Sequence, residues 1–231
     1  MSVAARAWDA IWRWPNGLLW RLSAPLTLRS RGAKFDLFIS TIGADPRHLI
    51  LDVGGGAHEA RGGNYFEGHY PYPERLVTCV YGIDKELAGF RRQHPRIQVV
   101  AGDGRALPFG DQVFDVAVSN AVIEHVGSRA QQRAFVAELA RVARRVFLAT
   151  PNHWFPVDMH TLIPIAHYLP PRPRFAIYRR LGRDNWASLD RLNLLTAREL
   201  RAMAPPGTTA TLVKLRLLGL THSVVMILRT P

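Results

Sequence analysis

The segment 49–59, LILDVGGGAHE, constrains the fold more than any other part of the chain. Its apolar run shows no alternation, which is typical of a strand buried on both faces of a parallel sheet. The glycines that follow let the backbone turn sharply and approach a ligand closely. A nucleotide hydrolase loop would continue with Gly-Lys-Ser or Gly-Lys-Thr, and a dinucleotide fingerprint needs a glycine where Glu59 stands. The segment is therefore neither a nucleotide hydrolase loop nor a dinucleotide fingerprint. It either binds another kind of ligand or is a glycine turn that binds none.

The length and cysteine content place the chain in a broad class. A chain of 231 residues is long enough for one sizeable core. The single cysteine, Cys79, lies in an apolar run, which excludes a disulfide scaffold and a thiolate metal cluster. No segment approaches the ~20 apolar residues of a membrane span, and the N-terminus lacks the features of a secretory signal. We expect a cytoplasmic protein.

The formal net charge of +12 would ordinarily indicate nucleic acid or an anionic membrane as a partner. Among the 30 basic residues, however, only Lys34, Lys85 and Lys214 are lysines, a ratio that a GC-rich coding sequence also produces. The chain carries no RGG repeat, basic tail or interleaved basic and aromatic module. These features disfavour nucleic acid as a partner.

Apolar periodicity predicts strands that alternate with helices. Helices are expected at 33–42, 64–70 and 131–144, and strands at 49–53, 77–83, 97–103, 114–120 and 146–149. This order predicts an α/β fold with a doubly wound parallel sheet, whose ligand site lies beyond the carboxyl ends of the strands. Two β-rich runs around Gly219 predict an antiparallel pair that closes the sheet.

Four predicted strands end in or near a polar residue. The residues at or next to the ends of the first four strands are, in turn, Asp52, Asp84, Asp103 and Asn120. A carboxylate at Asp84 can accept both hydroxyls of a ribose, and Asp103 is placed to accept from the exocyclic amine of adenine. Each residue alone could be a solvated loop residue or a helix cap. Together they predict a nucleoside-containing cofactor at one edge of the sheet.

At this point the sequence resembles the class I S-adenosylmethionine-dependent methyltransferases, in their small-molecule branch. The matching segments are LDVGGG, GID, GDGRALPFGDQVFDVAVSNAVIEHV and TPN, in that order, and they lie within residues 35–152. The resemblance implies a Rossmann-like, mostly parallel seven-stranded sheet and S-adenosyl-L-methionine as the cofactor. It implies cofactor contacts from Asp52, Gly54, Gly55, Gly56, Asp84, Asp103, Gly104 and Asn120. The chain departs from the family where His58 replaces the last motif glycine and where the connection from Gly56 to Asp84 is longer.

The chemistry implied by this resemblance is modest. A sulfonium methyl is already electrophilic, so the enzyme aligns the acceptor and excludes water. A hydroxyl acceptor benefits from a base with a pKa near neutrality, for which histidine is the usual choice. We expect His160 to act as this base or to orient the substrate, the alternative being a histidine hydrogen-bonded within a rigid loop. His125 is the second catalytic candidate, although it can also simply pack against the cofactor.

Acceptor recognition is expected in a segment rich in proline and arginine, 151–193, after the fifth strand. Asn152, His153, Trp154 and Asp158 are its candidate substrate-binding residues. Some relatives bind a divalent metal through an acid-x-x-Glu-His pattern, but here Ala121 stands at the position of the first acid. We therefore expect no metal.

The N-terminal residues 1–34 are expected to form an amphipathic helical extension of a methyltransferase domain that spans 35–231. Trp8, Ile11, Trp12, Leu19 and Leu22 have helical spacing, with a kink at Pro15. This apolar face either packs over the acceptor pocket or rests on a membrane interface, where tryptophan and arginine are well suited.

The sequence thus predicts methyl transfer to a small-molecule or lipid- or saccharide-linked acceptor, at oxygen. One alternative is an RNA or DNA methyltransferase, which the net charge favours. The end of the fourth strand reads SNAV, however, and lacks the Asp/Asn-Pro-Pro-aromatic motif of enzymes that methylate exocyclic base amines. The other alternative is a non-catalytic scaffold protein that binds the adenosyl cofactor.

Overall fold

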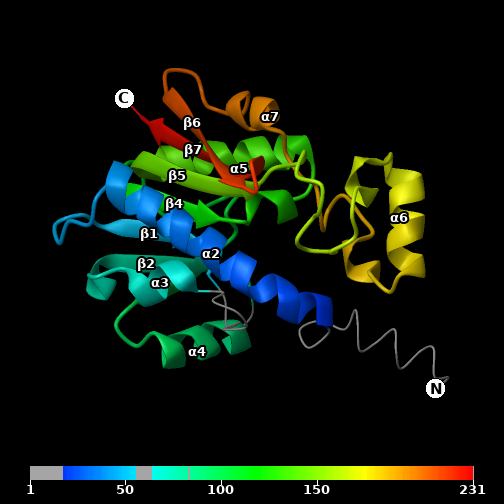
Figure 1. Cartoon of the computed structure of the whole chain (residues 1–231). Coiled ribbons are helices and arrows are strands. Elements are labelled where there is room, and N and C mark those ends of the chain that lie inside the picture. Colours follow the sequence, from blue (N-terminus) through cyan, green and yellow to red (C-terminus); the bar gives the residue numbers. More distant parts are fainter. Residues whose placement is uncertain (1–17, 56–63, 83, 231) are drawn as a thin grey trace.

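A computed structural model describes residues 18–55, 64–82 and 84–230 of the chain (Figure 1). The strands are β1 (Ile50–Val53), β2 (Leu76–Val80), β3 (Gln98–Ala101), β4 (Phe114–Asn120), β5 (Ala143–Pro151), β6 (Thr209–Leu217) and β7 (Leu220–Arg229). They form one seven-stranded sheet in the order β3-β2-β1-β4-β5-β7-β6. The strands β1 to β5 pair in parallel, and β7 pairs antiparallel with both β5 and β6. The predicted fold class is confirmed.

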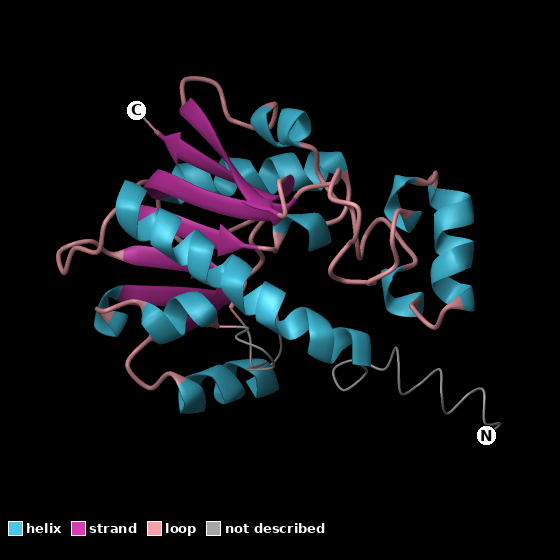
Figure 2. Cartoon of the chain, viewed as in Figure 1, coloured by secondary structure: helices cyan, strands magenta, loops and turns pink. Residues whose placement is uncertain are grey.

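Helices cover both faces of this sheet (Figure 2). They are α2 (Leu18–Thr41), α3 (Tyr65–His69), α4 (Asp84–Gln93), α5 (Arg129–Val142), α6 (Pro171–Arg180) and α7 (Ala197–Arg201). The helices α2, α3 and α4 pack on one face, and α5 and α7 pack on the other. A capping box fixes the start of α5. The Ser128 hydroxyl accepts a hydrogen bond from the Gln131 backbone N–H, and Oε1 of Gln131 accepts one from the Ser128 backbone N–H.

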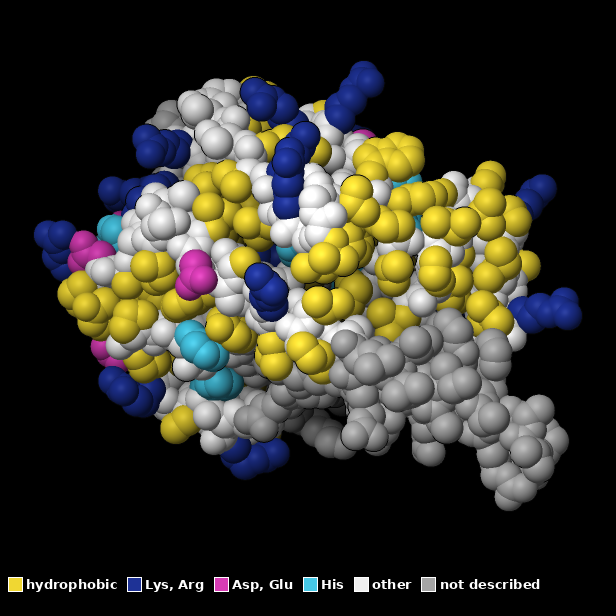
Figure 3. Space-filling model, viewed as in Figure 1, with side chains coloured by type: hydrophobic (Ala, Val, Ile, Leu, Met, Phe, Trp, Pro, Cys, Tyr) yellow, Lys and Arg dark blue, Asp and Glu magenta, His cyan; other side chains and the backbone are white. Residues whose placement is uncertain are grey.

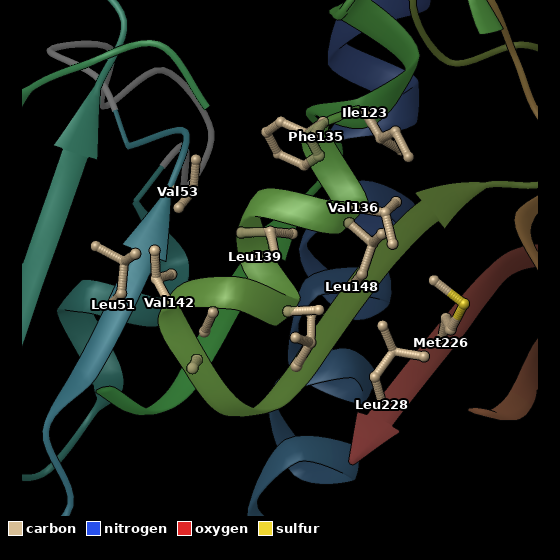
Figure 4. Close-up of a cluster of buried hydrophobic side chains, with 14 of the residues drawn as sticks. Leu51, Val53, Ile123, Phe135, Val136, Leu139, Val142, Leu148, Met226 and Leu228 are labelled. Carbon is tan, nitrogen blue, oxygen red and sulfur yellow. The ribbon is translucent and has the colours of Figure 1, made fainter. Parts of the chain in front are cut away.

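Two apolar clusters hold the layers together. Between the sheet and α5, side chains such as Leu51, Leu139 and Leu148 interdigitate in a buried layer (Figure 4). On the opposite face Phe38 of α2 is fully buried, and its ring meets Phe66 and Phe147 edge to face. All four residues of β1 are buried, as its unalternating apolar run predicted.

The segment between β5 and β6 has a small core of its own. Ile163, Ala166, Tyr178, Leu192 and Leu194 form a third buried cluster, separate from the two that flank the sheet. Helix α6 belongs to this segment and stands beside the sheet rather than on it (Figure 1). The predicted insertion at 151–193 is therefore packed around its own apolar residues.

Several element boundaries differ from the predictions. Helix α2 extends well before the predicted start at residue 33: it is helical from Leu18, the first described residue, contains Pro25 and continues without a break through residues 34 and 35. The strands β2 and β3 end at Val80 and Ala101, before their predicted ends, because the chain turns there to form the edge of the site. Trp8, Ile11, Trp12 and the kink at Pro15 lie outside the described residues.

Within the described ranges, none of the helices has the length and apolar character needed to cross a membrane.

The aromatic packing of α2 gives a stability prediction. Replacing Phe38 with alanine leaves a cavity between α2 and the sheet, so Phe38→Ala is expected to lower the free energy of unfolding by about 3–5 kcal/mol. Leu218→Ala is the control, because Leu218 is 92% exposed and its truncation is expected to change stability by less than about 0.5 kcal/mol. Urea denaturation followed by circular dichroism measures both. Equal losses in the two variants would show that α2 does not depend on this contact.

Candidate active site

The site lies where the neighbouring strands β1 and β4 end at the same edge of the sheet. The two strands pair in parallel from Ile50 with Val116 to Asp52 with Val118, so their carboxyl ends lie side by side. A cavity of about 740 Å³ opens at this edge. Its walls include the backbone of Gly54, Gly55 and Gly104 and the side chains of His125 and Trp186. The position matches the ligand site that doubly wound sheets generally provide.

The turn after β1 requires glycine. Gly54 has φ of +112°, and a Cβ atom built there would lie 2.2 Å from Cγ2 of Val122. A Cβ on Gly55 would lie 2.3 Å from Cγ2 of Thr78. Both positions therefore exclude a side chain, and the bare backbone forms part of the cavity wall. The third predicted residue of this turn, Gly56, lies outside the described residues.

The next part of the edge comes from the residues that follow β3. A Cβ on Gly104 would lie 2.3 Å from Cε2 of Phe135, so this position also needs glycine. Asp103 lines the cavity and accepts hydrogen bonds from Arg105, at 2.9 Å from Nε and 2.5 Å from Nη2. These bonds lower the pKa of Asp103. Asp84 is the first residue of α4, separated from the end of β2 by three residues, and its side chain lies outside the described part of the structure.

Beneath the glycine turn lies a pair of buried carboxyl groups. Asp52 and Glu67, from β1 and α3, are each 6% exposed and hydrogen-bonded to one another. Burial and the charge of Glu67 raise the pKa of Asp52 well above its usual range. Burial also raises the pKa of Glu67, although the hydrogen bond to Asp52 and the charge of Arg31 oppose this. The predicted cofactor residue Asp52 therefore supports the turn from below, and the cavity wall is formed by the residues after it.

Asn120, a predicted cofactor contact, is paired with a residue of α2. Its side-chain oxygen accepts a hydrogen bond from Nζ of Lys34 at 3.0 Å, so it contacts α2, and Asn120 is not among the residues that line the cavity. Burial lowers the pKa of Lys34 to about 8, although the charge of Glu124 opposes the shift. Lys34 entered the sequence analysis only through the charge count, and no local pattern could have linked it to this edge.

Two histidines from distant segments meet beside the cavity. His125 lines the cavity, and its Nε2 atom lies 3.1 Å from Nε2 of His160. The Nδ1 atom of His125 donates to the carbonyl oxygen of Arg191 at 2.7 Å. The Nδ1 atom of His160 donates to Oδ1 of Asp158 at 2.8 Å. Both predicted catalytic histidines are thus brought together, but His125 faces the cavity and His160 stands behind it.

Burial and the neighbouring charges together set the pKa values in this cluster. Burial lowers the pKa of His125. Burial also opposes the charged form of His160, but the charge of Asp158 and its hydrogen bond raise the pKa of His160 above its ordinary value. Burial would raise the pKa of Asp158, yet the contacts with His160 outweigh it and hold the pKa at about 2. Glu124 is fully buried, and its Oε1 atom lies 3.8 Å from Nε2 of His160.

The predicted substrate-binding residues are divided between two places. Asn152 and Trp154 line a second cavity of about 620 Å³ beside α7, whereas His125 lines the cavity at the strand ends. The Asn152 amide donates to the Thr221 carbonyl and ties β5 to β7. The His153 ring packs against Trp154, with centroids 4.9 Å apart. Asp158 reaches the site only through His160.

Other cavity residues were missed by the sequence analysis. Tyr81 directly follows β2 and is 76% exposed, while Trp186, Asp190 and Arg191 come from the insertion. The position of Tyr81 after a strand was a usable signal. The three insertion residues had none, because the path of an irregular segment depends on its tertiary packing.

The buried carboxyl pair predicts a pH-dependent stability. Because its pKa is raised on folding, Asp52 keeps a proton that the unfolded chain releases above a pH of about 4, so folding weakens as the pH rises. Asp52→Asn removes this group but retains a hydrogen-bonding amide. We expect its melting temperature to exceed the wild-type value by a margin that grows between about pH 4 and pH 8. Asp36→Asn, at an exposed position of α2, is the control. The prediction is contradicted if the melting-temperature difference between Asp52→Asn and wild type does not change with pH, as is expected for the control.

Comparison with known proteins agrees with this geometry. The family model described as "Methyltransferase domain" matches residues 51–146. An uncharacterized methyltransferase of Mycolicibacterium vanbaalenii is 34% identical over 155 residues, which cover 63% of this chain and 55% of the relative. The chain thus spans about half the length of this curated relative.

Solved structures share the whole fold at low sequence identity. A protein of Pyrococcus horikoshii OT3 aligns with a TM-score of 0.59 and 14% identity, covering 100% of both chains. The magnesium protoporphyrin IX methyltransferase of Synechocystis PCC 6803 with bound S-adenosylmethionine aligns with a TM-score of 0.58 and 10% identity, covering 100% of this chain and 92% of that one. The matched domain and the fold agree with the resemblance read from the motifs. Residues 51–146 thus match a methyltransferase domain, and the chain resembles the class I S-adenosylmethionine-dependent methyltransferases in sequence and in fold.

Proposed function

We propose that this protein transfers the methyl group of S-adenosylmethionine to an oxygen atom of a small-molecule or lipid- or saccharide-linked acceptor. The observation that carries the proposal is a single cavity with two different walls. One wall is the glycine edge of the sheet, and the other contains His125 and Trp186. A cofactor on the first wall and an acceptor on the second would meet inside one enclosure.

The glycine edge fits the cofactor. The cavity volume of about 740 Å³ lies within the range of roughly 300–1,000 Å³ that small-molecule sites occupy. Gly54, Gly55 and Gly104 leave the backbone open at the strand ends, and Asp103 supplies a carboxylate. When bound, S-adenosylmethionine supplies an electrophilic methyl group on a sulfonium whose departure leaves a neutral thioether. The chain therefore needs mainly to orient the two substrates and to exclude water.

The opposite wall fits a hydroxyl acceptor. The rings of His125 and Trp186 lie with their centroids 5.4 Å apart, which gives an aromatic surface next to an imidazole. We assign His125 as the catalytic residue that contacts the acceptor. His160 is a positioning residue, because it is not among the residues that line the cavity, its Nε2 atom meets Nε2 of His125, and Asp158 fixes its ring. Amine or carboxylate acceptors would have less use for such a cluster.

The surface of the insertion supports an amphiphilic acceptor. Ile165, Tyr168, Leu169 and Leu189 expose between 38% and 61% of their surface there. Apolar side chains gather over the part of the molecule that contains α6 (Figure 3). The insertion that contributes Trp186 to the cavity thus also presents apolar side chains to the outside, which suits a lipid-linked substrate.

Cofactor binding is the first test. Isothermal titration calorimetry with S-adenosylmethionine and S-adenosylhomocysteine is expected to show micromolar binding of both. Asp84→Ala is expected to weaken it about 10- to 100-fold, the effect of losing hydrogen bonds to a charged group. Asp111→Ala is the matched control, because Asp111 is 76% exposed and pairs only with Arg141 at the surface. A folded wild-type protein that binds neither compound would contradict the proposal.

The acceptor test uses labelled S-adenosylmethionine with lipid, saccharide and RNA extracts. Label in a lipid or saccharide fraction supports the proposal, whereas label confined to RNA would favour the alternative suggested by the net charge of +12. Binding without transfer to any fraction would favour the scaffold alternative. On a labelled acceptor, His160→Ala is expected to lower kcat while KM and S-adenosylhomocysteine affinity stay within about twofold. His69→Gln, on the exposed side of α3, is the control.

A further inference from the structure

We infer that Glu124, His125 and His160 form a binding site for a divalent transition-metal cation. One ligand atom from each residue lies within 4.8 Å of the other two. Glu124 and His125 belong to the 3₁₀ turn after β4, and His160 comes from the loop after β5. The expectation of no metal rested on Ala121 in a local spacing pattern. The structure supplies a third donor from a segment 35 residues further along the chain.

The two imidazoles are oriented as metal ligands are. Each ring donates its Nδ1 hydrogen to a fixed acceptor, the Arg191 carbonyl for His125 and the Asp158 carboxylate for His160. This arrangement leaves the Nε2 lone pairs for coordination, and both Nε2 atoms point to one place. Histidines that ligate metals are held through their other nitrogen by carbonyls or carboxylates of this kind.

The carboxylate of Glu124 provides an independent observation. Its Oε2 atom accepts from the Thr150 hydroxyl at 2.9 Å, which fixes the side chain. Its Oε1 atom is fully buried and has no hydrogen-bond partner within the described part of the chain, although it lies 3.8 Å from Nε2 of His160. A buried carboxylate oxygen without a partner is costly, and a cation between it and the two rings would remove that cost.

The charges nearby favour a cation. The cluster contains two carboxylates, Glu124 and Asp158, both buried. The other charge that acts on His160 is the Lys34 ammonium, whose Nζ atom is held by Asn120. Two negative groups against one positive group leave a net attraction for a divalent ion.

The donor set indicates which ion. Two imidazoles and one carboxylate suit Zn²⁺, Co²⁺ or Fe²⁺, whereas Mg²⁺ and Ca²⁺ prefer oxygen donors. Three protein ligands leave a position free for a further oxygen atom. Because His125 lines the cavity, the acceptor oxygen could take that position, a step that rests on the proposed function.

The test measures metal binding by the full chain after chelation and dialysis. Zn²⁺ is titrated by calorimetry, and Co²⁺ by its visible absorption. We expect one ion per chain, and a loss of at least about 100-fold in affinity for Glu124→Gln and His160→Ala. Asp158→Asn, which removes the carboxylate that holds the His160 ring, should weaken binding about 10- to 100-fold. His69→Gln controls for surface histidines and should leave the affinity unchanged.

Two measurements keep the outcome decisive. Glu124→Gln has nearly the shape of the wild-type residue, and its melting temperature together with S-adenosylhomocysteine binding reports whether it is folded. Failure of S-adenosylhomocysteine binding in wild type would count against the proposed function and leave the metal result standing. The metal site is refuted if Zn²⁺ does not bind one to one, if the ligand variants bind it as wild type does, or if Mg²⁺ binds more tightly. In that case a shared proton, not a metal, would join the two histidine rings.

Discussion

The parallel pairing of β1 with β4 is the constraint on which the site depends. Chain order reverses at this pair, so β2 and β3 extend the sheet one way and β5 the other. The Ser119 hydroxyl of β4 donates to the Val53 carbonyl of β1 at 2.9 Å and fixes the two strand ends together. The turn at Gly54 then meets Val122 in direct contact. A shift of one strand relative to the other would close the cavity or separate its two walls.

The site is assembled by contacts between distant segments. Lys34 of α2 contacts the end of β4, Glu67 of α3 lies under the turn after β1, and His160 of the insertion contacts His125. Each contact involves a buried ionisable group, whose desolvation is costly unless it is paired. These groups therefore make unfavourable contributions to the free energy of folding at this edge. The apolar clusters on both faces of the sheet must offset them. Such a balance is common where a fold provides chemistry.

The fold was largely predictable because its signals are local. The strand at Phe114–Asn120 was predicted at its observed bounds, since Phe114 and the apolar run 116–118 specify it locally. The start of α2 was missed because Pro25 stands within it and proline usually marks a helix boundary. In the site, the glycines and Asp103 follow strands and were found from that position. Lys34, Glu67 and Trp186 were missed, because only tertiary packing brings them to the edge.

The insertion between β5 and β6 has consequences for how such a protein can diversify. Its buried cluster around Tyr178 and Leu192 is separate from both clusters that flank the sheet. Substitutions on its outer surface and changes in the length of its loops therefore affect the structure only locally. They leave the strands that carry the glycine turn in place. The same segment supplies Trp186 and Arg191 to the cavity, on the side that the proposed function assigns to the acceptor. Under the proposed function, new acceptor preferences can therefore evolve in this segment while the glycine edge stays unchanged.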